Sequence, residues 1–448
     1  MLSTDQARDR ALHLVSLARK AGADAADAIY SGSGSTDVSI RLGALEDVQR
    51  SENEEIGLRA FVGSRSASVS TSDLSTSGLE ALADRVVAMA KEAPEDPWSG
   101  LAPEDRIHRG AFRDLDLMDD AFPSPAELRE RALACEEAAR AVKGVTNSEG
   151  AGASHGLGVS ALATSHGFAA GYAGSSHSVS ASVLAGEGGA MERDYAWHQT
   201  RHLGDMDSAA AIGTEAGNRA VARLNPAKLK SGPMTVIFDP RAGSSLLGHL
   251  IGAISGSSIT RKTSFLLDRL GEAVFASGIS IVDDPLRLRG IRSHAFDGEG
   301  LATSLTRIID KGLLTTWLLD SAAARQLSLS PTGHASRGTG GPPGASASNL
   351  YMEAGNTSPA DLMADVERGL YVTDLIGMGV NPLTGDYSRG ASGFLIEKGE
   401  RTSPVSEITI AGNLKDMFAR IIPADDLTFR YSTNVPTLRI DGMMIAGE

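Results

Sequence analysis

The order of one helix, several alternating strands and a second helix occurs twice in the N-terminal half of this chain. In the first copy, apolar residues recur at helical spacing over residues 4–21, and a second helical pattern covers residues 75–93. In the second copy, a helix follows the Ser124 cap and another covers residues 208–224. A helix buries its apolar stripe only against another layer, so each copy predicts a sheet with helices on it.

Short segments with alternating side chains supply the strands between these helices. Alternation of apolar and polar residues is typical of a half-buried antiparallel strand. The first copy contains four such segments, at residues 36–42, 44–50, 55–62 and 66–71, and in the second copy residues 145–197 form a series of Ser, Gly, Ala and His strands. Both copies are therefore predicted to be α+β units with antiparallel sheets.

The chain divides into three predicted domains. Residues 1–95 and 124–227 are the two α+β units, and a linker rich in Pro and Asp at 94–123 joins them. Residues 228–448 contain many short strands and few helices, which predicts a β-rich domain, a barrel or a sandwich, with helices on it. Within it, the Gly, Ser and Pro content of residues 334–348 predicts a mobile loop.

Charge and cysteine content limit the partners and the compartment. The net charge of −14 argues against nucleic acid or an anionic membrane surface as the main partner. No apolar run approaches the length of about 18 residues that a membrane span needs. Cys135 is the only cysteine, so no internal disulfide can form. With no signal-peptide pattern at the N-terminus, these features predict a cytoplasmic protein.

Several long passages of this sequence stand in a characteristic order. The C-terminal passages are Gly252–Ser258, Arg261–Asp268, Gly385–Phe394 and Glu407–Met417, and an N-terminal passage is Gly57–Gly63. Together they resemble the TldE (PmbA) branch of the TldD/PmbA metallopeptidase family, and the resemblance covers nearly the whole chain.

This resemblance implies a function and a set of partners. In the family, a TldD subunit holds zinc with a His-Glu-x-x-x-His helix and a distant Cys, and its complex with a TldE subunit cleaves unstructured peptides in an internal chamber. A TldE subunit shares the fold but lacks the metal site. The implied partners are peptide substrates and either a TldD-like catalytic subunit or a second copy of this chain. Zinc is expected on the TldD-type partner, and no cofactor on this chain.

The residues at the implied metal position agree with this expectation. A catalytic zinc needs about three protein ligands, an open position for water and a general base. In the helix predicted over residues 244–255, His249 is present, but Leu250 stands at the position of the base and Ile254 at that of the second ligand. A register one residue earlier places Gly248 and Ala253 at the ligand positions, which is no better.

The late thiolate ligand is also missing. The segment Arg420–Asp426 contains no cysteine, and Asp425 and Asp426 are hard ligands that replace a soft thiolate poorly. The sequence therefore predicts no metal ligand and no catalytic residue in this chain.

Other histidines offer weaker metal patterns. His198 and His202 share the spacing of a His-x-x-x-His helix, but the residues before them alternate as a strand, which would separate the two side chains too far for one ion. His155, His166 and His177 recur in successive predicted strands, and three histidines can hold a metal, but a sheet face that carries histidines is the simpler interpretation.

Four residues are candidates for contact with a peptide or a partner. Gly385–Gly390 carries Asp386, Ser388 and Arg389, but it lacks the Gly-x-Ser-x-Gly elbow and the nearby His of a serine hydrolase, so a tight turn is the simpler interpretation. The resemblance places this turn near the inner chamber. We therefore expect Asp386, Ser388, Arg389 and His249 to contact substrate or partner.

Three functions remain open from the sequence. The chain is a metal-free subunit of a peptide-processing complex, or a stand-alone metallopeptidase or hydrolase that acts as a homodimer, or a peptide-binding protein without catalysis. The missing ligands favour the first.

Overall fold

Side-chain caps fix where the helices begin. The structure, a computed structural model, describes residues 1–447. At the starts of α1 and α3, Ser3 and Ser124 accept a backbone N–H, and Gln6 and Glu127 complete the reciprocal capping box. Since such caps are visible in the sequence, the helices of the N-terminal half begin and end within about two residues of the predicted positions.

The N-terminal half contains the two predicted units, each with three strands between two helices. The first unit consists of α1 (Thr4–Lys20), β1 (Ala25–Arg41), β2 (Ala44–Val62), β3 (Arg65–Thr71) and α2 (Thr76–Glu92). The second consists of α3 (Pro125–Ala141), β4 (Val145–Thr164), β5 (Ala169–Ala185), β6 (Glu192–Thr200) and α4 (Ala209–Ala222). Short 3-10 turns lie at Glu104–Arg106, Gly188–Ala190 and Leu203–Asp205.

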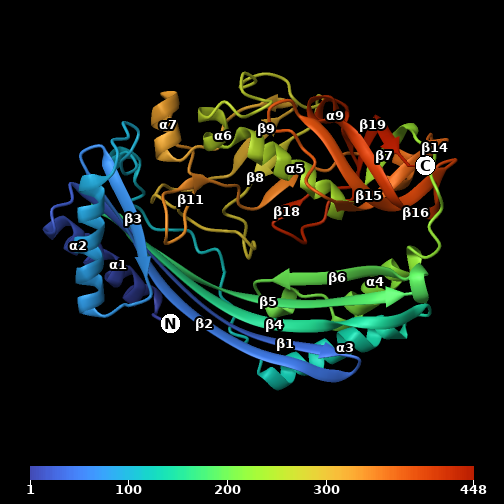
Figure 1. Cartoon of the computed structure of the whole chain (residues 1–448), viewed down its shortest axis with the longest axis horizontal. Coiled ribbons are helices and arrows are strands. Elements are labelled where there is room, and N and C mark those ends of the chain that lie inside the picture. The colour runs from blue at the N-terminus through green and yellow to red at the C-terminus, as the bar shows by residue number, and fades with distance from the viewer. Residues whose placement is uncertain (448) are drawn as a thin grey trace.

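The two units join edge to edge in one antiparallel sheet. β1 pairs with β4 from Asp27↔Thr164 to Ile40↔Ala151, which gives the strand order β3-β2-β1-β4-β5-β6. Figure 1 shows this sheet as a long curved layer whose concave face is turned toward the C-terminal domain. The N-terminal half therefore forms one wall of the molecule.

The two faces of this sheet have different chemistry because successive side chains point to opposite sides. The convex face is apolar and packs on the helices, α1 and α2 at one end and α3 and α4 at the other. The concave face is largely Ser and Gly at its centre, as Ser31, Ser33 and Ser35 of β1 show. A polar, small-residue surface thus faces the C-terminal domain.

The C-terminal domain contains a closed five-stranded barrel and a second sheet. The barrel order is β16-β15-β14-β7-β19, and β16 pairs again with β19 to close it. The barrel and its adjoining β17 comprise β7 (Gly232–Phe238), β14 (Arg368–Ile376), β15 (Asp386–Glu397), β16 (Glu400–Asn413), β17 (Ile422–Pro423) and β19 (Leu438–Ala446). This confirms the predicted β-rich domain and identifies it as a barrel.

The remaining elements pack around this barrel. The second sheet has the order β10-β9-β8-β13-β18, and β11 pairs with β12. These strands are β8 (Ile281–Asp283), β9 (Thr306–Asp310), β10 (Leu313–Leu314), β11 (Ala335–Ser336), β12 (Gly344–Ala345), β13 (Leu350–Met352) and β18 (Thr433–Asn434). The helices are α5 (Pro240–Ile254), α6 (Gly256–Thr260), α7 (Ser321–Leu327), α8 (Pro359–Met363) and α9 (Leu414–Arg420).

One expectation about local structure is wrong. Residues 44–50 and 55–62 belong to one strand, β2, because β1 pairs with β2 along its whole length, including its polar middle. The segment 334–348 is a loop with two short strands, as predicted, and it packs onto the first unit, where the Arg337 side chain is fully buried and Thr339 is 9% exposed. Within residues 1–447, no helix combines the length and the apolar character needed to cross a membrane.

Candidate functional site

Helix α5 is the element where the family motif was expected. It begins behind Asp239 with Pro240 in its first turn, and one face buries Leu246, Leu247 and Leu250. The opposite, uncovered face of α5 contains His249 between two glycines, Gly248 and Gly252. A methyl group built on either glycine would meet no atom within 4 Å, so the backbone of α5 is open on this side.

Strand β15 places two polar side chains toward the core of the barrel domain. Tyr387 and Arg389 are two residues apart, so they share one face of the strand. Tyr387 is 1% exposed and packs in the same apolar core as α5. Asp386 and Ser388 point the other way and are exposed. The structure therefore brings Arg389 near His249 and separates both from Asp386 and Ser388.

Asp386 has a local structural role. Its carboxylate accepts hydrogen bonds from Thr384 Oγ1 at 2.7 Å and Asn413 Nδ2 at 3.0 Å. These bonds, in that order, lower the pKa of Asp386. The carboxylate thus ties the turn before β15 to the end of β16, as expected of the tight-turn interpretation of this passage.

His249, Tyr387 and Arg389 form a cluster, which we call the α5–β15 cluster. The rings of His249 and Tyr387 are 6.0 Å apart between centroids and nearly perpendicular. His249 Nε2, Tyr387 Oη and Arg389 Nε are all buried without a hydrogen-bond partner among residues 1–447. Tyr387 is the member that the sequence did not predict, although its place two residues before Arg389 puts it on the same strand face.

Burial and one positive charge set the titration of this cluster. Burial lowers the pKa of His249, and the charge of Arg389 lowers it further. Burial also raises the pKa of Tyr387 to about 12, against the opposing effect of Arg389. The guanidinium therefore lies close to both rings, beside a neutral imidazole and a neutral phenol. Its contact with the Tyr387 hydroxyl is close enough to lower the pKa of that phenol, but the geometry falls short of a full hydrogen bond.

Metal-ligand geometry is not found in the described part of the chain. Across residues 1–447, no group of three or more His, Cys, Asp or Glu side chains is arranged to hold a metal ion. His198 lies in β6 and contacts Asp207, whereas His202 lies beyond the strand and contacts Asp116. These two histidines are therefore held by separate carboxylates.

Two of the three regularly spaced histidines do meet. His155 and His177 are directly paired across β4 and β5, and their rings stack at 4.9 Å. His177 Nε2 lies 3.0 Å from a carboxylate oxygen of Asp119 in the linker. His166 lies apart, with Nδ1 at 3.3 Å from the carbonyl oxygen of Ala102. The pair lies between the two helix-covered ends of the convex face and fixes the linker there.

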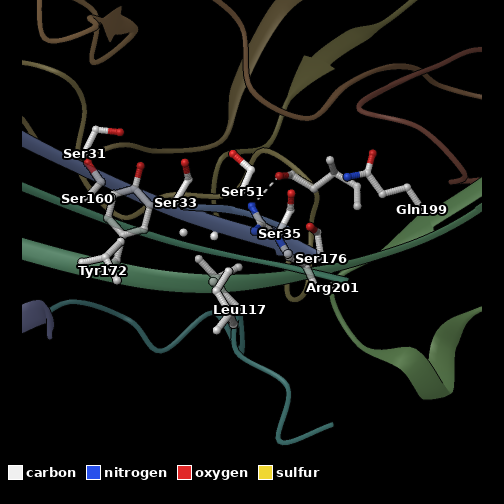
Figure 2. A pocket seen from close by; sticks show the side chains of 18 residues that line it. Ser31, Ser33, Ser35, Ser51, Leu117, Ser160, Tyr172, Ser176, Gln199 and Arg201 are labelled. Carbon is white, nitrogen blue, oxygen red and sulfur yellow. Dashed lines mark hydrogen bonds between the residues drawn. The ribbon is translucent and has the colours of Figure 1, made fainter. Parts of the chain in front are cut away.

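A cavity of about 480 Å³ lies over the centre of the concave face. Figure 2 shows serine side chains of β1, β2, β4 and β5 around it, together with Tyr172, Gln199 and Arg201. Arg201 is held by the carbonyl oxygens of Ser175 and Ile291 at 3.1 and 2.5 Å. No acidic residue lines the cavity. Its walls offer many small groups that both donate and accept hydrogen bonds.

Two neighbouring cavities extend this space. A cavity of about 310 Å³ shares Ser160, Tyr172 and Arg201 with it, and one of about 330 Å³ shares Gln199 and Ile291. The latter is also lined by Ser244 of α5. Gly248 lies one turn after Ser244 and Gly252 one turn further, so the open face of α5 continues from this cavity. We call these three connected cavities the trough, and Ser244 in its wall is where the open face of α5 begins.

Comparison with known proteins places this chain in a family. Three family models match: PmbA/TldA metallopeptidase domain 1 at residues 26–90, the central domain at 119–224 and the C-terminal domain at 231–447. The Metalloprotease PmbA of Escherichia coli O157:H7 is 38% identical over 95% of this chain and 93% of its own length. A PmbA homolog of Haemophilus influenzae is 38% identical over 97% and 94%.

Solved structures share the fold. A Bacteroides thetaiotaomicron protein, described as a candidate modulator of DNA gyrase, has a TM-score of 0.91 and 30% identity over the full length of both chains. TldE from Thermococcus kodakarensis has a TM-score of 0.87 and 20% identity, covering 98% of this chain and all of its own. These matches confirm the resemblance seen in the sequence: the chain belongs to the PmbA/TldD metallopeptidase family, in its PmbA (TldE) branch.

Proposed function

We propose that this chain is the metal-free subunit of a two-subunit, TldD/TldE-type peptidase that processes unstructured peptides in the cytoplasm. In this proposal a TldD-like partner supplies zinc, the general base and the bound water. This chain supplies the curved sheet and the trough that hold the peptide.

The residues around His249 carry this proposal. A zinc ion would need further ligands on α5, but the neighbouring positions hold Leu250, Ala253 and Ile254. Arg389 adds a fixed positive charge beside His249, which opposes a divalent cation at the same place. The donor set here does not fit zinc, which supports a catalytic metal on the partner chain.

The trough supports a peptide as the ligand. An extended peptide presents N–H and C=O groups along its length, and each needs a partner when it leaves water. Serine hydroxyls such as those of Ser31, Ser33 and Ser35 serve both kinds of group. Small side chains also leave room for varied peptide side chains, which suits an enzyme complex with broad sequence tolerance.

Cys135, the only cysteine of the chain, supports a cytoplasmic location for this protein. It is buried in α3, and burial raises the pKa of its thiol to about 12, so it is an unreactive core residue. A chain without disulfides suits a reducing compartment.

Metal analysis and peptidase assays of the purified chain, alone and mixed with a TldD-like chain from the same genome, test this proposal. We expect less than stoichiometric zinc and no cleavage from the chain alone, and chelator-sensitive cleavage of an unstructured peptide from the mixture. Chelator-sensitive cleavage by the chain alone would support the stand-alone homodimeric enzyme instead. Peptide binding without cleavage in the mixture would support a binding protein.

A further inference from the structure

Arg389 is an arginine without an acidic partner. It forms no ion pair within residues 1–447, and its Nε atom is buried without a hydrogen bond. By contrast, Arg439 of the same domain contacts both Asp365 and Asp441. A half-buried guanidinium carries up to five N–H donors in a fixed fork, so Arg389 retains unused capacity for an anion.

Two neighbours of Arg389, Tyr387 and His249, also have buried polar atoms without a hydrogen-bond partner. Tyr387 is almost fully buried, and leaving its hydroxyl without a partner costs about 1–3 kcal/mol. His249 Nε2 is in the same condition. A ligand oxygen placed between them accepts from the phenol and from the guanidinium, and from the imidazole when Nε2 carries the proton. A carboxylate has two oxygens with about four lone pairs in a plane that matches the arginine fork.

His249 and Arg389 are each partly exposed, so the cluster reaches the surface beside the open face of α5, while the polar atoms named above lie below that surface. Gly248 and Gly252 flank His249 and leave the helix backbone uncovered. The same face begins at Ser244 in the wall of the trough. A peptide that lies in the trough and continues along α5 would bring its end to Arg389.

We propose that His249, Tyr387 and Arg389 form a carboxylate-binding site that holds the C-terminal carboxylate of an extended peptide. This inference rests on the proposed function, because it takes the trough to be the place of the peptide. It assigns this chain a second task beyond forming the chamber wall, which is to fix one end of the substrate and thereby set its direction.

Fluorescence anisotropy with the purified full-length chain tests this site. The probes are one labelled neutral peptide with a free C-terminal carboxylate, the same peptide with a C-terminal amide, and an amidated peptide with one internal Glu. We expect amidation to weaken binding at least about tenfold, since charge-assisted bidentate bonds are lost. Recovery of affinity by the internal Glu would show that the site takes a side-chain carboxylate as well. Equal binding of the free acid and both amides would overturn the proposal.

Three variants separate the site from general effects on folding. Arg389→Lys keeps the charge without the fork, Tyr387→Phe removes only the hydroxyl, and His249→Gln removes the ring. Each variant is expected to bind the free-acid peptide several-fold more weakly and to bind the amidated peptide as tightly as the native chain does. Arg129→Met, an exposed change on α3, is the matched control and should alter neither. Displacement of the free-acid peptide by inorganic phosphate at equal affinity would contradict a carboxylate site.

The outcome of this test is independent of metal analysis. Zinc bound by this chain would contradict the proposed function, but it would not affect the difference in binding affinity between the free-acid and the amidated peptide. Conversely, loss of that difference would leave the metal-free subunit in place and remove only the carboxylate site.

Discussion

The carboxylate of Asp27 in β1 accepts a hydrogen bond from Arg337, which lies 310 residues later in the sequence. Asp27 is also bonded by Arg59 of the neighbouring strand, with Nε at 3.2 Å. Burial alone would raise the pKa of Asp27, but the charges of Arg337 and Arg59 outweigh it and lower the pKa. One buried carboxylate therefore joins the N-terminal sheet to the segment 334–348.

Replacement of Asp27 by Asn should strongly destabilise this junction. The change removes the one carboxylate that both buried arginines contact, and removing one partner of a buried ion pair costs about 3–5 kcal/mol in comparable sites. Urea unfolding should show an earlier first transition. Arg50→Met, which breaks an exposed pair with Glu52, is the control and should change stability by less than about 1 kcal/mol. If the two variants lost the same amount of stability, Asp27 would not be the residue that holds the segment 334–348 to the sheet.

The Asp27 contribution also has a defined pH dependence. Its folded pKa is lower than the unfolded value of about 3.9, so its stabilisation is complete above that pH. It is lost as the pH falls through the folded pKa, and the Asn variant should lack this acid-sensitive part.

Gly57→Ala should detach the segment 334–348 from β2. A methyl group on Gly57 would lie 1.9 Å from the carbonyl oxygen of Thr339, and both atoms belong to backbone or Cβ positions that cannot rotate away. We expect a loss of about 1–3 kcal/mol and faster tryptic cleavage after Arg337, whose side chain is fully buried in the folded chain. In the control Gly34→Ala, the nearest atom is 3.8 Å away. Unchanged cleavage in the Gly57 variant would show that the segment is not held there.

Glu299, near this junction, should make stability fall as the pH rises toward neutrality. Burial raises its pKa to about 7, Arg59 opposes the rise and Asp297 adds to it. An unfolded Glu ionises near pH 4.3, so between these values the folded chain holds a proton that the unfolded chain has lost. The stabilisation is thus full below the unfolded pKa and is lost as the pH rises through about 7.

Glu299→Gln removes this titration while an oxygen remains to accept from Ser321 N, now bonded at 2.8 Å. The free energy of unfolding of the variant should depend less on pH between about 4.5 and 7.5 than that of the native chain, by about 4 kcal/mol at most. Glu80→Gln on the exposed side of α2 is the control. Parallel pH profiles of the Glu299 variant and the native chain would reject the raised pKa.

The sequence predicts those parts of the fold that depend on local signals. Ser3, Ser75, Ser124 and Ser208 mark helix starts because their side chains cap the first turn in any tertiary context. The pairing of β1 with β4 carries no such signal. It joins segments more than 100 residues apart in sequence, and alternation fixes only which face is buried, not which strand is the neighbour.

The candidate site shows the same limit. His249 and Arg389 were predicted as contact residues, but their meeting depends on the packing of α5 against the barrel. Tyr387 was missed because a lone tyrosine in a strand is usually a core residue. Its unpartnered hydroxyl is a property of its surroundings, which the sequence does not display.

His155 and His177 should make the attachment of the linker sensitive to acid. Burial lowers the pKa of both histidines, and in His177 the neighbouring His155 adds to this effect while Asp119 opposes it. The pKa of a histidine in the unfolded chain is about 6.5, so below that pH the unfolded chain binds protons that the folded chain does not bind. Their contribution is complete above that pH and is lost as the pH falls toward the folded values, opposite in sign to that of Glu299.

His155→Phe tests this, because a phenyl ring retains the stacking on His177 and cannot take up a proton. At about pH 5 the native chain should exchange the amide hydrogens of residues 115–122 faster than the variant, and at about pH 7.5 the two should agree. Asp119 N–H, bonded to Ser175 Oγ at 2.8 Å, reports the linker directly. His13→Gln, an exposed change on α1, is the control. Equal exchange of native chain and variant at the lower pH would mean that Asp119 holds the linker whatever the charge on the histidines.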